Sequence, residues 1–230
     1  MLAALHLPKE CTYKQFVPKK QFYEHGNFTQ KEKDLFVKAI ERITLYAQLT
    51  RDNTNVPPFK DEKQSYEEIS VFLVELKQER QIDKIAKLMM EAIPYPMVLV
   101  FVYEDTYNFY GAHQRDNLHD TDKIILEKIY QTGFIKLENI AEQVSYPKFN
   151  KQNLFTVYDD YMQAIIAFNL ATRNVKESTD NEALLEKIQA KEEKIELLRN
   201  KMKRENHFNK KMDLNIQIKQ LEKQLQNMEG

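Results

Sequence analysis

The chain has 230 residues, with 34 Lys and Arg against 35 Asp and Glu, one Cys, no Trp and four Gly. A net charge of −1 argues against a dedicated nucleic-acid coat or a polybasic membrane binder. A single cysteine excludes an intramolecular disulfide framework and a zinc site built from several cysteines. The glycines form no GxGxxG, P-loop or GxSxG motif, so the usual sequence marks of nucleotide binding and α/β-hydrolase chemistry are absent.

The start of the chain, MLAALHLPKE, lacks the basic segment and the long apolar stretch of a secretory signal. The longest apolar run, residues 97–103, has seven residues. A membrane-spanning helix needs about 20. We therefore expect a soluble, cytoplasmic protein with no membrane partner.

The composition changes once, near residue 175. All seven prolines and nearly all aromatic residues come before this point, and Phe208 is the only aromatic residue after it. A segment rich in charged residues, Gln, Asn and Leu or Ile is typical of long exposed helices. The sequence predicts an α/β globular domain over residues 1–173, a junction over 174–180 and a helical arm over 181–230.

The first predicted helix follows a capping box formed by Thr29 and Glu32. Apolar residues then recur at helical spacing at Phe36, Ile40, Ile43 and Ala47. This spacing predicts a helix that runs to about Leu49. The polar, proline-containing stretch 51–64 predicts a loop.

A strand, a helix and a second strand are predicted next. Residues 69–76 and 97–103 are apolar and rich in β-branched and aromatic side chains, which indicates buried strands. Between them, apolar residues of 82–93 recur at helical spacing until Pro94 and Pro96 end the pattern. This order is a βαβ unit, which implies that the two strands are parallel.

Further elements complete the predicted domain. Residues 107–112 follow a short polar turn and are expected to return as a hairpin partner, while 123–131 fit a strand or a helical turn equally well. A third helix is indicated by the spacing of Leu154, Tyr158, Tyr161, Ile165 and Phe168. The expected fold is α/β (α+β): a small mixed sheet of three or four strands with helices packed on it.

The arm carries two apolar heptad seams. One comprises Leu184, Ile188, Ile195, Leu198 and Met202, interrupted by Lys191; the other comprises Leu214, Ile218, Leu221, Leu225 and Met228. On one straight helix the twelve residues from Met202 to Leu214 would rotate the seam by roughly 120°. The sequence therefore favours an antiparallel hairpin or coiled coil with its turn near residues 205–210. The alternative is one long helix with an intermolecular seam.

Five stretches of the chain carry a family resemblance. They are LPKE, VPKKQFYEHGNF, EEISVFLVELKQ, AIPYPMVLVFVYEDTYNFYGAH and RENHFNKKMDLNIQIKQLEKQL. In this order they resemble DUF4391, a bacterial and archaeal domain of unknown function, over essentially the whole chain. The resemblance implies companions of helicase and DNA-methyltransferase type in restriction or phage-defence loci, and it supplies no catalytic residue.

A possible catalytic pair lies at the end of the predicted strand 69–76. Glu75 and Lys77 are two residues apart, so on a strand they share a face. This is the Glu-x-Lys half of a divalent-metal nuclease motif, in which the acid binds Mg²⁺ and the lysine steadies the water or phosphate. A second acid is required, and the upstream candidates are Asp61, Glu67, Glu68 and Glu41. The alternative is a solvated strand end, and apart from this nuclease hypothesis no cofactor is expected.

The histidines and the cysteine are weaker candidates. One polar loop holds possible metal ligands at His113, Asp116, His119, Asp120 and Asp122, although a solvated loop has the same composition. His6 and His25 are isolated. Cys11 has no neighbouring base in the sequence, so a small buried apolar role is expected for it.

The expected turn of the arm is strongly basic. Six cations, Arg199, Lys201, Lys203, Arg204, Lys210 and Lys211, fall within thirteen residues that contain one acid, Glu205. Such a turn would suit nucleic-acid phosphates or an acidic protein surface, while a solvated helical face is the plain alternative. Phe208 within this run favours a contact surface.

Three functions follow from these features. The leading one is a non-enzymatic accessory protein that docks through its arm onto a protein partner, such as a helicase or DNA methyltransferase, or onto a second copy of itself. The second is a nuclease centred on Glu75 and Lys77. The third is a nucleic-acid binder that uses the basic turn.

Overall fold

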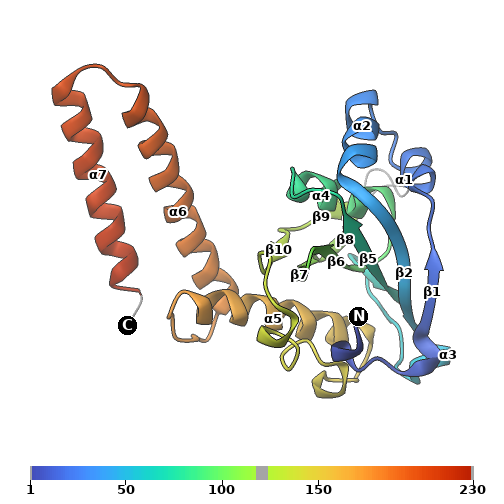
Figure 1. Ribbon diagram of the computed structural model, residues 1–230. Coiled ribbons are helices and arrows are strands. Elements are labelled where there is room, and N and C mark those ends of the chain that lie inside the picture. Colours follow the sequence, from blue (N-terminus) through green and yellow to red (C-terminus); the bar gives the residue numbers. More distant parts are fainter. Residues whose placement is uncertain (1, 118–123, 229–230) are drawn as a thin grey trace. The chain divides into compact units, whose positions relative to one another are not determined.

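The computed structural model describes residues 2–117 and 124–228, and the chain divides into two compact units, residues 1–165 and 166–230. The first unit is built on a sheet whose strands lie in the order β1-β2-β5-β6-β7-β10 (Figure 1). These strands are β1 (Thr12–Phe16), β2 (Ile40–Thr50), β5 (Glu68–Leu76), β6 (Met97–Tyr103), β7 (Thr106–Gly111) and β10 (Tyr130–Gln131). Only β5 and β6 are parallel, so this is a mixed and mostly antiparallel sheet.

Helices cover both faces of the sheet. Figure 1 shows α1 (Lys19–His25), α2 (Gln30–Ala39) and α4 (Ile82–Ala92) on one side and α5 (Leu154–Thr172) on the other. Smaller elements border the sheet: the helix α3 (Arg51–Thr54), the ribbon of β3 (Phe59–Lys60) with β4 (Ser65–Tyr66), the ribbon of β8 (Gln114–Asp116) with β9 (Ile124–Leu126), and the 3₁₀ turns Ala3–Leu5, Lys9–Cys11, Leu137–Asn139 and Tyr146–Lys148. The described part of the chain thus has a mixed α/β fold.

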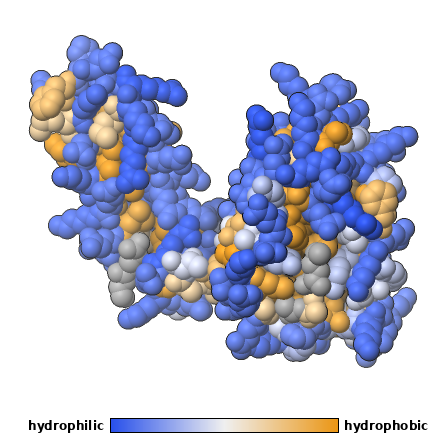
Figure 2. Space-filling model, in the orientation of Figure 1, coloured by the Kyte–Doolittle hydropathy of each residue, from blue (hydrophilic) through white to orange (hydrophobic). Residues whose placement is uncertain are grey.

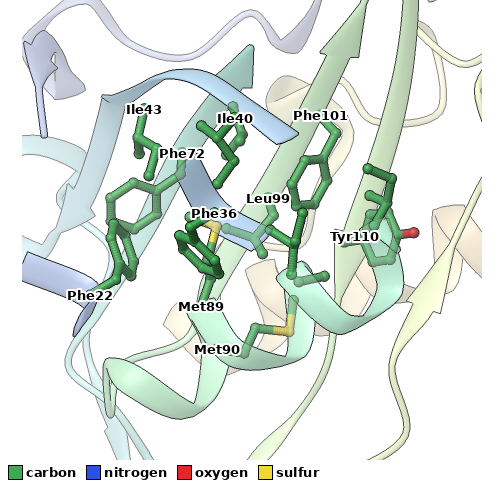
Figure 3. Close-up of a cluster of buried hydrophobic side chains, with 14 of the residues drawn as sticks. Phe22, Phe36, Ile40, Ile43, Phe72, Met89, Met90, Leu99, Phe101 and Tyr110 are labelled. Atoms are coloured by element: carbon green, nitrogen blue, oxygen red, sulfur yellow. The ribbon is translucent and has the colours of Figure 1, made fainter. Parts of the chain in front are cut away.

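The larger hydrophobic core lies between the sheet and the helices α1, α2 and α4. Figure 3 shows the ring of Phe22 between those of Phe72 and Phe36, with centroid separations of 5.9 Å to Phe72 and 6.4 Å to Phe36. Met89 and Met90 of α4 fill the space beneath Leu99 and Phe101 of β6, and all of these side chains are buried. This packing explains why residues 82–93 carry their apolar side chains at helical spacing, as predicted.

The opposite face of the sheet packs against α5. The hydroxyl of Tyr158 lies 2.9 Å from the carbonyl oxygen of Met97 and accepts the backbone N–H of Ala112 at 3.0 Å. Gly111 permits this close approach, because a Cβ there would collide with the sulfur of Met162. Helix α5 begins at Leu154, as the apolar spacing predicted.

The predicted helix over residues 30–49 is correct only in its first half. The capping box of Thr29 and Glu32 is present and α2 follows it, but the chain turns into strand β2 at Ile40. Bulges between Ile40 and Arg42 and between Leu45 and Ala47 shift the strand's alternation. Buried residues therefore fall at spacings of three and four that imitate a helix.

The sheet is larger than the three or four strands predicted, because β1 was missed and β2 was assigned to a helix. The βαβ prediction is confirmed by the parallel pairing of β5 with β6, and residues 106–111 form the expected hairpin partner. In the stretch 123–131, the described residues form the short strands β9 and β10 rather than a helical turn.

The second unit contains the end of α5 and two further helices. Asp180 caps the first of them, α6 (Asn181–Arg204), by accepting the N–H of Ala183 at 2.9 Å. Three residues, 205–207, separate it from α7 (Phe208–Gln226), which returns beside α6 (Figure 1). Near the C-terminal end of α5, Arg173 pairs with Glu192 of α6 through two hydrogen bonds of 3.0 Å.

Candidate functional site

Helices α6 and α7 are held together by a narrow apolar seam. Ile195, Leu198 and Ile218 are buried in it, and Met202, Leu214, Leu221 and Leu225 pack around them. On the surface, Arg199 pairs with Glu222 at 2.6 Å, and Lys191 donates to the side-chain oxygen of Gln224 at 2.5 Å. Residues near the end of α7 thus contact α6 at Lys191 and Arg199, so the two helices run antiparallel and residues 205–207 form the turn of the hairpin.

The basic residues predicted as a binding site gather at this turn. All six cations are exposed, and Arg199 is committed to Glu222. No salt bridge among the described residues engages the other five, Lys201, Lys203, Arg204, Lys210 and Lys211. Glu205 accepts the backbone N–H groups of Asn206 and His207 at 2.8 and 2.9 Å, and these bonds, with nearby Lys210, lower the pKa of its carboxyl.

An apolar stripe adjoins the basic turn. Phe208, Met212 and Ile216 follow one another at four-residue spacing on α7 and are 73%, 50% and 50% exposed. Residues at this spacing lie on one face of a helix, and the seam residues Leu214 and Ile218 lie on another. Figure 2 shows hydrophobic residues at the surface of the hairpin near its turn, among hydrophilic ones. Helix α7 therefore presents a second apolar face that α6 does not cover.

Glu75 and Lys77 lie at the end of β5, as predicted. Glu75 is half-buried and lies opposite Arg42 in the backbone register of β2 and β5. The ammonium of Lys77 lies 3.5 Å from a carboxylate oxygen of Glu41. The other upstream acids are elsewhere engaged: Asp61 accepts two backbone N–H groups of its own loop, and Glu67 pairs with Lys60. Glu68 begins the strand that Glu75 nearly ends.

No group of three or more His, Cys, Asp or Glu side chains within the described residues is placed to hold a metal ion. Of the proposed ligand loop, His119, Asp120 and Asp122 lie outside those residues, and Asp116 is exposed on β8. His113 is instead part of a packed network. Its Nδ1 lies 2.5 Å from the hydroxyl of Tyr66, and its Nε2 lies 3.3 Å from Asp159.

The remaining single residues have structural partners. His6 Nδ1 lies 3.0 Å from the hydroxyl of Ser145, and His25 Nδ1 lies 2.7 Å from the carbonyl of Gln21. Cys11 is fully buried and its sulfur lies 3.3 Å from the side-chain oxygen of Asn53. Burial, with a smaller contribution from Glu10, raises the pKa of this thiol to about 11. These residues support the fold.

Comparison with known proteins identifies the lineage. A family model described as a domain of unknown function matches residues 5–225. The chain belongs to the DUF4391 family. This confirms the resemblance seen in the sequence. No curated protein and no solved structure matches the chain.

Sequence reasoning missed one site in this family member. A cleft of about 350 Å³ lies between α2 and the turn from β5 to α4, and its lining is mostly polar and basic. The lining residues are Lys31, Asp34, Leu35, Lys38, Gln78, Arg80, Gln81 and Lys84. The first four recur at spacings of three, one and three, so they share one face of α2. That pattern was visible in the sequence, but the partner face across the cleft was not.

Within residues 2–117 and 124–228, none of the helices combines the length and the apolar character needed to cross a bilayer.

Proposed function

We propose that this protein is a cytoplasmic, non-enzymatic accessory protein that docks through a coiled-coil hairpin onto an acidic surface of a partner protein. The partner class suggested by the family resemblance is a helicase or DNA methyltransferase of a restriction or phage-defence system. The observation that carries the proposal is the exposed apolar stripe beside five unpaired cations at the turn.

The two components of this surface have different roles in binding. The cations would steer an acidic partner toward the turn and raise the association rate. The stripe would supply affinity, because burying a large apolar side chain contributes about 1.5–3 kcal/mol. Phe208, with 73% of its surface exposed, is the natural anchor.

The hairpin suits a docking role because its seam and its contact surface are separate. Ile218 is buried against Ile195 and Leu198, whereas Ile216, two residues earlier, is half exposed. A partner can therefore cover Phe208, Met212 and Ile216 without separating α6 from α7.

Affinity copurification with the full-length, tagged chain tests the proposal. The tagged chain is the bait, and the candidate prey are a helicase and a DNA methyltransferase of a restriction or phage-defence system. The charge variant is Lys201→Gln, Lys203→Gln and Arg204→Gln together, and the apolar variant is Phe208→Ser with Met212→Ser. Each should reduce recovery of the partner at least about tenfold, which corresponds to 1.4 kcal/mol.

The matched control removes three exposed lysines of the same hairpin away from the turn: Lys187→Gln, Lys194→Gln and Lys219→Gln. It should retain the partner. Equal recovery with the turn variants and the control would refute docking through the turn. Light scattering of the free chain then separates self-association from docking, because a dimer abolished by the apolar variant would identify a second copy as the occupant.

A nucleic-acid backbone is the second candidate for the same turn, favoured by the unpaired cations next to an exposed aromatic ring. Each phosphate contact releases counterions and steepens the dependence of affinity on salt. Fluorescence anisotropy with a labelled 20-nucleotide single strand should then show a salt slope that the charge variant flattens. A slope unchanged by the charge variant would exclude the turn as the contact.

A further inference from the structure

We infer that the cleft between α2 and the β5–α4 turn binds the phosphate group of a small phosphorylated ligand of the nucleotide type. The cleft belongs entirely to the first unit and contains none of the hairpin residues.

Charge is the first support. Four cations line the cleft, Lys31, Lys38, Arg80 and Lys84, against one lining acid, Asp34. Lys84 pairs with Glu32 at 3.3 Å. For Lys31, Lys38 and Arg80, the described part of the chain offers no carboxylate within salt-bridge distance. Three like charges around one hollow repel one another, and a bound dianion would relieve that repulsion.

The backbone of the cleft is the second support. The turn leads from the end of β5 into the first turn of α4, an eleven-residue helix. Gln81 precedes the helix in a left-handed conformation, with φ of 51°, and its side chain makes no capping hydrogen bond. The amide N–H groups of a helix's first turn point toward an anion, and the helix dipole favours negative charge there.

Topology is the third support. Strands β5 and β6 are the parallel pair of the sheet, and the turn follows the carboxyl end of β5. In mostly parallel α/β sheets, ligands bind at the carboxyl ends of the strands, and the one parallel pair of this mixed sheet places the cleft at such an end. The cleft thus combines that position, unpaired cations and an uncapped helix start.

The dimensions favour a small ligand over a polymer. A volume of about 350 Å³ lies at the lower end of the range for small-molecule sites, about 300–1,000 Å³. Leu35 contributes an apolar side chain to the lining. Asp34, which accepts a hydrogen bond from Gln30 at 2.8 Å, contributes a carboxylate to the lining.

Isothermal titration calorimetry of the full-length chain tests the inference, with inorganic pyrophosphate and ADP as the probes. We expect binding that weakens as salt is raised. The variant Lys38→Gln with Arg80→Gln should weaken both probes at least about tenfold, because each substitution removes a cation that would make a charge-assisted hydrogen bond to the phosphate. Both side chains are exposed, and circular dichroism checks that the variant is folded.

The matched control is Lys20→Gln with Lys87→Gln, which removes two charges from the same unit outside the cleft, where they pair with Glu24 and Glu91. It should change the affinity less than about twofold. Absence of binding at millimolar pyrophosphate and ADP, or equal loss in the control, would overturn the inference. So would binding of a 12-nucleotide single strand, lost in the cleft variant, without binding of ADP.

The hairpin charge variant, Lys201→Gln with Lys203→Gln and Arg204→Gln, distinguishes phosphate binding in the cleft from the proposed docking function of the hairpin. It should leave pyrophosphate and ADP binding unchanged, since none of its residues lines the cleft. Loss of phosphate binding in that variant would assign the anion to the hairpin instead.

Discussion

The hydroxyl of Tyr158 lies 2.9 Å from the carbonyl oxygen of Met97, a residue 61 positions earlier in the chain. The same oxygen lies 3.0 Å from the carbonyl oxygen of Ala112 and accepts the N–H of Ala112 at 3.0 Å. One fully buried side chain of α5 therefore satisfies backbone groups at the start of β6 and just beyond β7.

Replacing Tyr158 by Phe should lower the free energy of unfolding by about 1–3 kcal/mol, because buried backbone groups lose their partner. Tyr161→Phe is the matched control: its hydroxyl donates a longer hydrogen bond, 3.2 Å, to the carbonyl of Tyr110, so a smaller loss is expected. Urea denaturation measures both. A loss for Tyr158→Phe no greater than that for Tyr161→Phe would contradict the argument.

Cys11 should be unreactive in the folded chain. Its pKa is raised to about 11, mainly by burial, so at pH 8 a fraction on the order of 10⁻³ is thiolate, the reactive form. Ellman's reagent should therefore modify the native protein at least about 100-fold more slowly than the chain in guanidinium. Because the folded pKa lies above the unfolded one, this thiol stabilises the fold below pH 8.5, and that contribution is lost as the pH rises toward 11. Rapid modification at pH 8 would show that the thiol is accessible.

The capping box should make α2 sensitive to acid. The pKa of Glu32 is lowered chiefly by the N–H of Thr29, then by the hydroxyl of Thr29 and by Lys84. Its contribution to stability is therefore present above the unfolded value of about 4.3 and is lost as the pH falls through the folded value. Glu32→Gln should flatten the acid side of the unfolding free energy measured by urea between pH 3 and 7. An unchanged slope would mean that the carboxylate contributes nothing.

We expect Lys77 to take part only in a surface ion pair and not in catalysis. Its pair with Glu41 is a surface one, with side chains 45% and 64% exposed. Lys77→Ala should thus change the free energy of unfolding by less than about 1 kcal/mol. We expect no DNA cleavage with Mg²⁺ or Mn²⁺ by the wild type. Cleavage that disappears in both Glu75→Ala and Lys77→Ala would instead establish the nuclease.

Substitutions at two nearby isoleucines of α7 should distinguish the residue that stabilises the hairpin from the residue that contacts the partner. Ile218→Ala removes a buried seam residue and should lower hydrogen-exchange protection in α6 and α7, with a local loss of roughly 2 kcal/mol. Ile216→Ala, at a half-exposed position, should leave protection unchanged and weaken partner binding. Equal protection in the two variants would contradict the assignment of the seam.

Local patterning determined much of the first unit. Residues 69–76 and 97–103 were predicted as strands and 82–93 as a helix, because the buried face of each element leaves an unbroken apolar period. The same reasoning was wrong for residues 40–49. There, two bulges within β2 changed the period, and pairing with β5 outweighed the helical spacing.

The candidate sites divide in the same way. The basic turn and Phe208 were predicted from the sequence because their members are neighbours in the chain. The cleft was not predicted from the sequence, because Lys38 and Arg80 are 42 positions apart in the chain. Only the packing of α2 against the β5–α4 turn brings them to the same cleft. By itself the sequence determined the spacing of the apolar residues, the runs of charged residues and the family. Only the tertiary structure decided which distant side chains face one another, because strand order and bulges cannot be deduced from the spacing of residues within one element.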